Sequence, residues 1–88
     1  MRPQAVAGLE IRLVGDELLV HDPAAKKIHV LNQSAGEVLK LCDGTREIGD
    51  IVARLCEQTG ADAQIVGADV DRIIDQFQQL GLIADGPT

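Results

Sequence analysis

Residues 17–42 read ELLVHDPAAKKIHVLNQSAGEVLKLC, and the spacing of the apolar residues changes within this stretch. Two short apolar runs, residues 17–21 and 27–31, flank a polar segment in which Pro23 can preset the φ of a turn, so the first half predicts two strands joined by a short loop. The second half has apolar residues at i, i+3, i+4 and i+7, which predicts a helix that Asn32 or Ser34 can cap. These apolar positions are Ala35, Val38, Leu39 and Cys42.

The segment before residue 17 predicts one more strand. Leu9, Ile11 and Leu13 alternate with charged residues, which is the period of a half-buried strand, and Gly15 with Asp16 supplies a tight turn. Three short strands in succession favour an antiparallel meander over residues 9–31.

The segment after residue 42 predicts two more helices. Asp43 and Gly44 end the first helix, Gly60 ends the second and Gly81 ends the third, whose start is either Asp62 or Asp69. The expected apolar seam of the third helix is Val66, Val70, Ile73, Phe77 and Leu80. One core is expected to contain Leu39, Ile51, Leu55, Ile73, Phe77 and Leu80. The fold class is therefore α+β, in the order βββααα, as a single domain over residues 1–88 with an ordered core at about 9–83 and frayed ends.

Composition and charge exclude several classes of function. The chain has 88 residues, 14 acidic and 8 basic, with a net charge of −6, which is the wrong sign for binding a phosphate backbone. Phe77 is its single aromatic residue, so stacking on nucleobases is excluded. The sequence has no apolar run long enough for a membrane span or a signal peptide, so a cytoplasmic protein that binds neither nucleic acid nor membrane is expected.

Catalytic and metal motifs are also missing from the sequence. His21 and His29 lie on neighbouring predicted strands and could approach each other, but two histidines without a third ligand are typical of exposed strand residues. Ser34 has no nucleophile motif around it, and no glycine-rich phosphate loop occurs. Cys42 and Cys56 stand at helical spacing among apolar residues, as buried reduced thiols do. We expect no catalytic activity, no cofactor and no metal.

A longer ordered pattern resembles a known family. Residues 30–55, VLNQSAGEVLKLCDGTREIGDIVARL, and residues 68–83, ADVDRIIDQFQQLGLI, resemble the PqqD family, whose members are also described as recognition elements for ribosomally synthesised and post-translationally modified peptides (RiPPs). The asparagine–serine cap, the CDG helix end, Asp69 with Val70, and the closing glycine, leucine and isoleucine follow the order of the family. The resemblance covers residues from about 17 to 83.

The resemblance implies a winged-helix-like fold and a peptide-binding function. Members bind the leader segment of a precursor peptide, which adds as a strand beside the third strand and lies in a groove walled by the third helix, and they act as peptide chaperones for a modifying enzyme. The peptide-binding residues implied here are Lys27, Ile28, His29, Val30, Leu31, Val70, Asp71, Ile74, Asp75 and Gln78. The implied partners are a precursor peptide and an enzyme such as a radical SAM protein or a leader peptidase, in pyrroloquinoline quinone (PQQ) biosynthesis or another RiPP pathway.

Several alternatives stay open. Ile74 lies outside the expected seam and is either a groove anchor or a core residue. Lys26 and Lys27 either steer an acidic leader or protect the strand edge, and that edge could also pair with a second copy in a homodimer. A winged-helix transcriptional regulator is disfavoured by the acidic third helix, and an acyl-carrier-like protein is disfavoured by the three strands and by the lack of an aspartate before Ser34.

Overall fold

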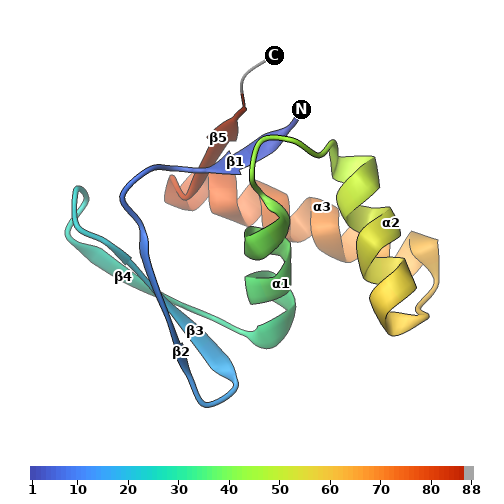
Figure 1. Ribbon diagram of the computed structural model, residues 1–88, viewed down its shortest axis with the longest axis horizontal. Helices are drawn as coiled ribbons and strands as arrows, with labels where there is room; N and C mark the ends of the chain where they lie inside the picture. Colours follow the sequence, from blue (N-terminus) through green and yellow to red (C-terminus); the bar gives the residue numbers. More distant parts are fainter. Residues whose placement is uncertain (87–88) are drawn as a thin grey trace.

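A three-stranded antiparallel sheet lies beside three helices in the computed structural model, which describes residues 1–86 (Figure 1). The elements are β1 (Pro3–Ala5), β2 (Glu10–Val14), β3 (Glu17–Asp22), β4 (Lys27–Leu31), α1 (Gln33–Leu41), α2 (Ile48–Thr59), α3 (Ala63–Leu80) and β5 (Ile83–Asp85). The predicted α+β class is confirmed, with three strands followed by three helices. Residues 87 and 88, which the predicted domain includes, lie outside the described residues.

The strand order is β2-β3-β4, so β3 is the central strand and β4 is an edge. A two-residue turn joins β2 to β3 and begins with Gly15, whose φ of 62° suits the first position of such a turn. The β3–β4 turn is closed by a hydrogen bond of 3.2 Å from the Lys26 N–H to the Pro23 carbonyl. Val20 pairs with His29, and His21 pairs with Ile28. Side chains that are directly opposite in this register share a face of the sheet.

The helix caps follow the sequence prediction and resolve its alternatives. Asn32, not Ser34, caps α1, because its Oδ1 accepts the Ala35 N–H at 2.9 Å. Asp62, not Asp69, caps α3 by accepting the Gln64 N–H at 2.8 Å. Gly60 closes α2 in the left-handed conformation, as predicted.

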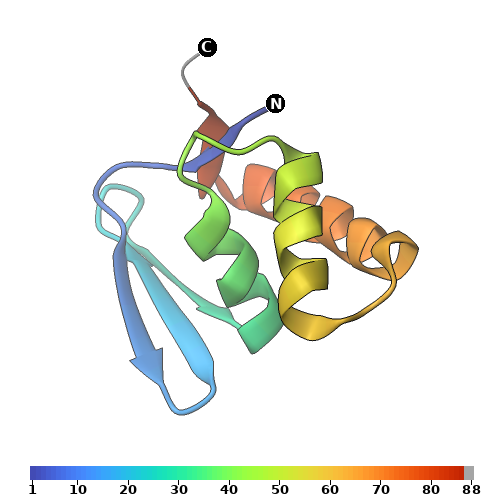
Figure 2. The ribbon, with the colours of Figure 1, turned by 45° about the vertical axis from the view of Figure 1, so that its right-hand side comes forward.

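The core lies between the three helices and one face of the sheet, which we call the inner face and which carries Leu18, Val20 and Leu31. A Cβ added at Gly36 would lie 3.3 Å from the side chain of Leu18, so glycine allows α1 to approach β3 closely. Figure 2 shows the helices on one side and the β2–β3 hairpin extending away from them. The inner side of β2 therefore has little cover, and Leu13 is 67% exposed.

The predicted core is correct for Leu39, Ile51, Ile73 and Phe77, which are all buried. Leu55 is only partly buried, and Leu80 is exposed. The reason for the error at Leu80 is the path of the chain at the end of α3.

The chain turns back at Gly81, and Leu82 fills the place that the seam gave to Leu80. The Leu82 N–H donates to the Phe77 carbonyl at 2.9 Å, and the Leu82 side chain is fully buried. Ile74 is buried as well, so the buried stripe of α3 is Val70, Ile73, Ile74 and Phe77.

The two ends of the chain are paired, so the predicted ordered core of about residues 9–83 is too narrow. β1 and β5 form a two-stranded antiparallel sheet in which Pro3 pairs with Asp85 (Figure 1). Pro3 is fully buried, and Glu47 accepts hydrogen bonds of 3.1 Å from the Met1 amino group and from Arg2 Nε. These hydrogen bonds lower the pKa of Glu47.

Phe77→Ala is expected to destabilise the domain strongly. Phe77 has no exposed surface and is the largest of the fully buried side chains, so its truncation leaves a cavity and costs about 3–5 kcal/mol. Thermal and urea unfolding measure this loss. A melting temperature equal to that of the wild type would contradict the docking of α3 on the core.

Candidate peptide-binding site

The free edge of β4 is the first component of the site. β4 pairs with β3 on one side, and no other strand of residues 1–86 lies on its other side. An edge strand of five residues carries main-chain N–H and C=O groups that can hydrogen-bond to an added strand. The structure places all five strand residues that were predicted to bind peptide on this edge: Lys27, Ile28, His29, Val30 and Leu31.

The side chains of β4 alternate between the two faces of the sheet, and its two exposed aliphatic residues face away from the helices. Ile28 and Val30 lie on the face opposite the helices, the outer face, and are 67% and 57% exposed. His29 and Leu31 lie on the inner face, where Leu31 is buried. His29 is half-buried, and its Nε2 is buried without a hydrogen-bond partner in the described part of the chain. A polar atom without a partner therefore lies within the strand that carries the free edge.

The two histidines do not form a pair, contrary to one possibility raised by the sequence. His21 lies on the outer face, where its Nδ1 is 3.0 Å from Glu10 Oε2, and His29 lies on the inner face. The prediction of exposed strand histidines holds for His21, whose side chain is 44% exposed, and fails for His29, which is half-buried with a buried Nε2. Among residues 1–86, no group of three or more histidine, cysteine or carboxylate side chains could hold a metal ion.

The α3 residues predicted to wall the groove separate into two sets. Asp71, Asp75 and Gln78 are exposed, whereas Val70 and Ile74 are buried in the core. Ile74 is 3% exposed, so the alternative of a core residue holds and the free protein offers almost no Ile74 surface for a peptide to contact. The exposed part of this wall is acidic and polar rather than apolar.

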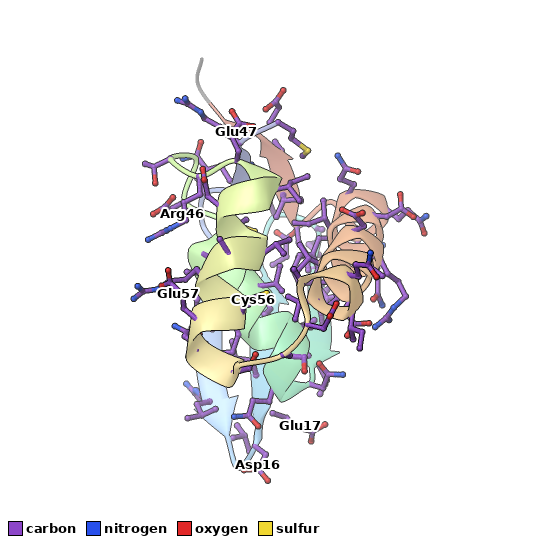
Figure 3. The ribbon with its side chains drawn as sticks, turned by 90° about the vertical axis from the view of Figure 1, so that its right-hand side faces the viewer. Asp16, Glu17, Arg46, Glu47, Cys56 and Glu57 are labelled. Carbon is purple, nitrogen blue, oxygen red and sulfur yellow. The ribbon has the colours of Figure 1, made fainter. Side chains whose placement is uncertain are left out.

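A groove between the helices was not predicted from the sequence. It has a volume of about 420 Å³ and lies between the start of α1, the end of α2 and the first half of α3. Figure 3 shows the three helices from the side where α2 and α3 are joined. Gln33 and Ser34, at its rim, follow the end of β4 by two and three residues. Its apolar lining comprises Val38, Leu55, Ala61, Ile65, Val66, Val70 and Ile73.

Ile65 provides the sequence signal for this groove. It is 64% exposed and lies one residue before Val66, which begins the expected seam. A large apolar side chain outside the seam of a helix indicates a second apolar surface.

A family model gives the first comparison with known proteins. The model described as "Coenzyme PQQ synthesis protein D (PqqD)" matches residues 17–83, which is most of the chain and includes β3, β4 and all three helices. The chain belongs to the PqqD family. Among curated proteins, none matches it.

Two solved structures share the fold of this PqqD-family chain. The structure of TbiB1 in complex with the TbiA(beta) leader peptide has a TM-score of 0.80 at 13% identity and covers 97% of this chain and 99% of its own. The solution structure of the PqqD part of Methylobacterium extorquens PqqCD, described as a functional, stand-alone RiPP recognition element, has a TM-score of 0.77 at 24% identity. That match covers 93% of this chain and 87% of its own. Both likenesses include the three-stranded sheet and the helices that form the candidate site.

The cysteines of this PqqD-family chain differ in their surroundings. Cys42 is buried, and burial together with the charge of Asp43 raises its thiol pKa to about 11. Cys56, on α2, is only half-buried, so the prediction of two buried thiols holds for one of them (Figure 3). Neither forms a disulfide in the described structure.

A thiol-reactive dye at neutral pH should therefore label one cysteine faster than the other. The thiolate is the reactive form, and both burial and the raised pKa suppress it at Cys42. We expect labelling at Cys56, read by mass spectrometry of the native protein, and labelling of both residues in denaturant. Faster labelling of Cys42 than of Cys56 in the native protein would contradict the position of Cys42 in the core.

Proposed function

We propose that this protein is a non-catalytic recognition domain that binds the leader segment of a ribosomally made precursor peptide and presents the precursor to a modifying enzyme. The observation that carries the proposal is the unpaired edge of β4, in a chain of the PqqD family whose fold matches a leader-peptide complex. The leader adds antiparallel to Lys27–Leu31 through main-chain hydrogen bonds, which supply affinity that does not depend on leader sequence.

Selectivity comes from the surfaces beside this edge. A leader antiparallel to β4 has its N-terminal part near Leu31, beyond which the chain enters α1 at the rim of the groove. An apolar leader side chain that follows this path reaches the groove at Ile65 and Val66. This apolar anchor replaces the one that the sequence assigned to Ile74, because Ile74 is buried. Asp71 and Asp75 add negative charge on α3 and favour basic groups in the bound leader.

The surface of α3 disfavours the alternative of a DNA-binding winged helix. Asp69, Asp71 and Asp75 are exposed on it together with Arg72, whose guanidinium is 3.7 Å from Asp69. A recognition helix with this charge balance would be repelled by DNA phosphates.

None of the helices within residues 1–86 is long and apolar enough to cross a membrane.

Chemical-shift mapping by NMR tests the binding mode, with synthetic leader peptides from a search of the neighbouring genes for short precursor peptides. We expect the largest amide perturbations in Lys27–Leu31, with smaller ones at the start of α1 and in the first half of α3. Added main-chain hydrogen bonds change the amide environment of an edge strand directly. Perturbations confined to β1, β5 and the α1–α2 loop, with β4 unchanged, would reject strand addition even if the peptide binds.

A further inference from the structure

The outer face of the three-stranded sheet carries an exposed apolar surface that the leader does not need. In the register of the sheet, Arg12, Leu19 and Val30 form one row across this face, and Glu10, His21 and Ile28 form the next. The most exposed apolar side chains of these two rows lie on β4, where Ile28 and Val30 are each more than half exposed. Strand addition uses the main chain of the β4 edge and leaves this face open.

The outer face is also hollowed and carries an unpaired charge. A shallow hollow of about 460 Å³ is lined by Glu10, Ile11, Arg12, Leu19, His21 and Ile28. Arg12 is exposed and takes part in none of the ion pairs found within residues 1–86. Half of the lining is aliphatic, and the charged part comprises the Glu10–His21 pair and the unpaired guanidinium of Arg12. A hollow of this kind fits a partner surface that is partly apolar and carries a carboxylate.

The direction of the bound leader places the modifying enzyme at this end of the sheet. A leader precedes the part of the precursor that is modified, so the modified part continues from the C-terminal end of the leader. In the antiparallel arrangement this end lies beside Lys27, at the β3–β4 turn, which is far from the α2–α3 connection in Figure 1. The row of Glu10, His21 and Ile28 is next to this turn, since Asp22 pairs with Lys27.

The charge distribution favours the sheet over the helices as the surface for the enzyme. Residues 32–88 contain ten of the fourteen acidic residues and four basic ones, whereas residues 10–31 contain four acidic and three basic residues. A carboxylate-bearing partner is therefore repelled by the helical part of the molecule and meets Arg12 on the sheet.

We propose that the outer face, centred on Arg12, Leu19 and Ile28, is the docking surface for the modifying enzyme, through an apolar enzyme surface with a carboxylate opposite Arg12. The inference rests on the proposed leader binding. It assigns leader and enzyme to two adjoining surfaces of one sheet, with the leader on the β4 edge and the enzyme on the outer face.

Two neighbouring residues of β2 provide a matched test. Arg12 and Leu13 are both exposed and point to opposite faces of the sheet, so Arg12→Glu places a carboxylate on the outer face and Leu13→Glu places one on the inner face. Leu19→Glu, on the central strand, is a second outer-face variant. Because Leu19 is only half exposed, the melting temperature of the Leu19→Glu variant is measured first to establish that the variant is folded.

The experiment uses the full chain with a leader peptide that it binds and a modifying enzyme, both identified by a search of the neighbouring genes. Leader affinity is measured by fluorescence anisotropy, and association with the purified enzyme is measured by calorimetry. For Arg12→Glu and Leu19→Glu we expect leader affinity within about twofold of wild type and enzyme association weakened about tenfold or more. For Leu13→Glu we expect neither to change.

Four outcomes would overturn the inference, and each has a different meaning. Unchanged enzyme association in both outer-face variants would place the enzyme elsewhere, and an equal loss with Leu13→Glu would show that added charge alone is responsible. A dimer of the wild-type chain that Arg12→Glu dissociates would assign the face to a second copy. No leader binding by the wild type would reject the proposed function itself, and with it the direction on which the docking site depends.

Discussion

Ile74→Asp is expected to remove most of the stability of the domain. Ile74 is 3% exposed in the middle of α3 and lies in the core with Val70, Ile73 and Phe77. The described structure buries no charged side chain, so a carboxylate at this position has no charged partner. The substitution removes a buried apolar side chain and buries a charge, and together these cost more than about 4 kcal/mol. A small domain has about 5–10 kcal/mol of stability in total.

Ile65→Asp is the matched control, because it makes the same change in the same helix at a residue that is 64% exposed. We expect its free energy of unfolding to stay within about 0.5 kcal/mol of wild type. Circular dichroism in urea and the dispersion of amide signals in NMR spectra measure both variants. A folded Ile74→Asp domain with wild-type stability would show that Ile74 is not in the core, and it would restore Ile74 as a groove residue.

The different fates of Ile74 and Leu80 show what periodicity alone misses. The seam predicted from spacing includes Leu80 and leaves Ile74 outside, whereas the structure buries Ile74 and exposes Leu80. At the end of α3, Gly81 has a φ of 74° and turns the chain so that Leu82 enters the core. The spacing of apolar residues within a helix cannot predict that a side chain beyond the end of the helix will fill the core, so Leu80 was predicted in place of Leu82.

The main sheet and the helices could be predicted because their signals are local. Alternating residues, turn residues and caps lie within a few positions of one another. Asn32 and Asp62, which the sequence offered as helix caps, cap α1 and α3 in the structure. β1 and β5 have three residues each and pair across nearly the whole chain, with Pro3 opposite Asp85. Segments this short have no detectable period, and long-range pairing leaves no local signal.

The sequence could predict that β4 is a free edge strand, but it could not predict on which face of the sheet each β4 side chain lies. A meander of three strands leaves the last strand at an edge, so the free edge of β4 follows from the strand order. Which side chains of that strand meet the helices depends on the register with β3. The sequence predicted exposed histidines on the strands and did not assign Ile28 or Val30 to either face. The structure places the histidine on the inner face and the two aliphatic residues on the outer face.

Proline in the middle of β4 is expected to weaken leader binding strongly. Neighbouring residues of a strand direct their N–H groups to opposite sides, so one of His29 and Val30 directs its N–H away from β3. Fast hydrogen exchange in the free protein identifies that residue, because its amide has no partner. Proline there removes the donor without removing a hydrogen bond to β3, and its ring obstructs the approach of another strand.

The expected loss of leader affinity is about 30- to 140-fold, because an obstructed edge loses two or three main-chain hydrogen bonds of about 1 kcal/mol each. The matched control is proline on β2, the opposite edge of the same sheet, at whichever of Arg12 and Leu13 also directs its N–H away from β3. This control carries the same change on an edge that the leader does not use, and its leader affinity should equal that of wild type. Melting temperatures establish that both variants are folded before anisotropy titration with the leader. Wild-type affinity in a folded β4 variant would reject strand addition at this edge, and an equal loss in the β2 variant would show that proline acts by disturbing the sheet as a whole.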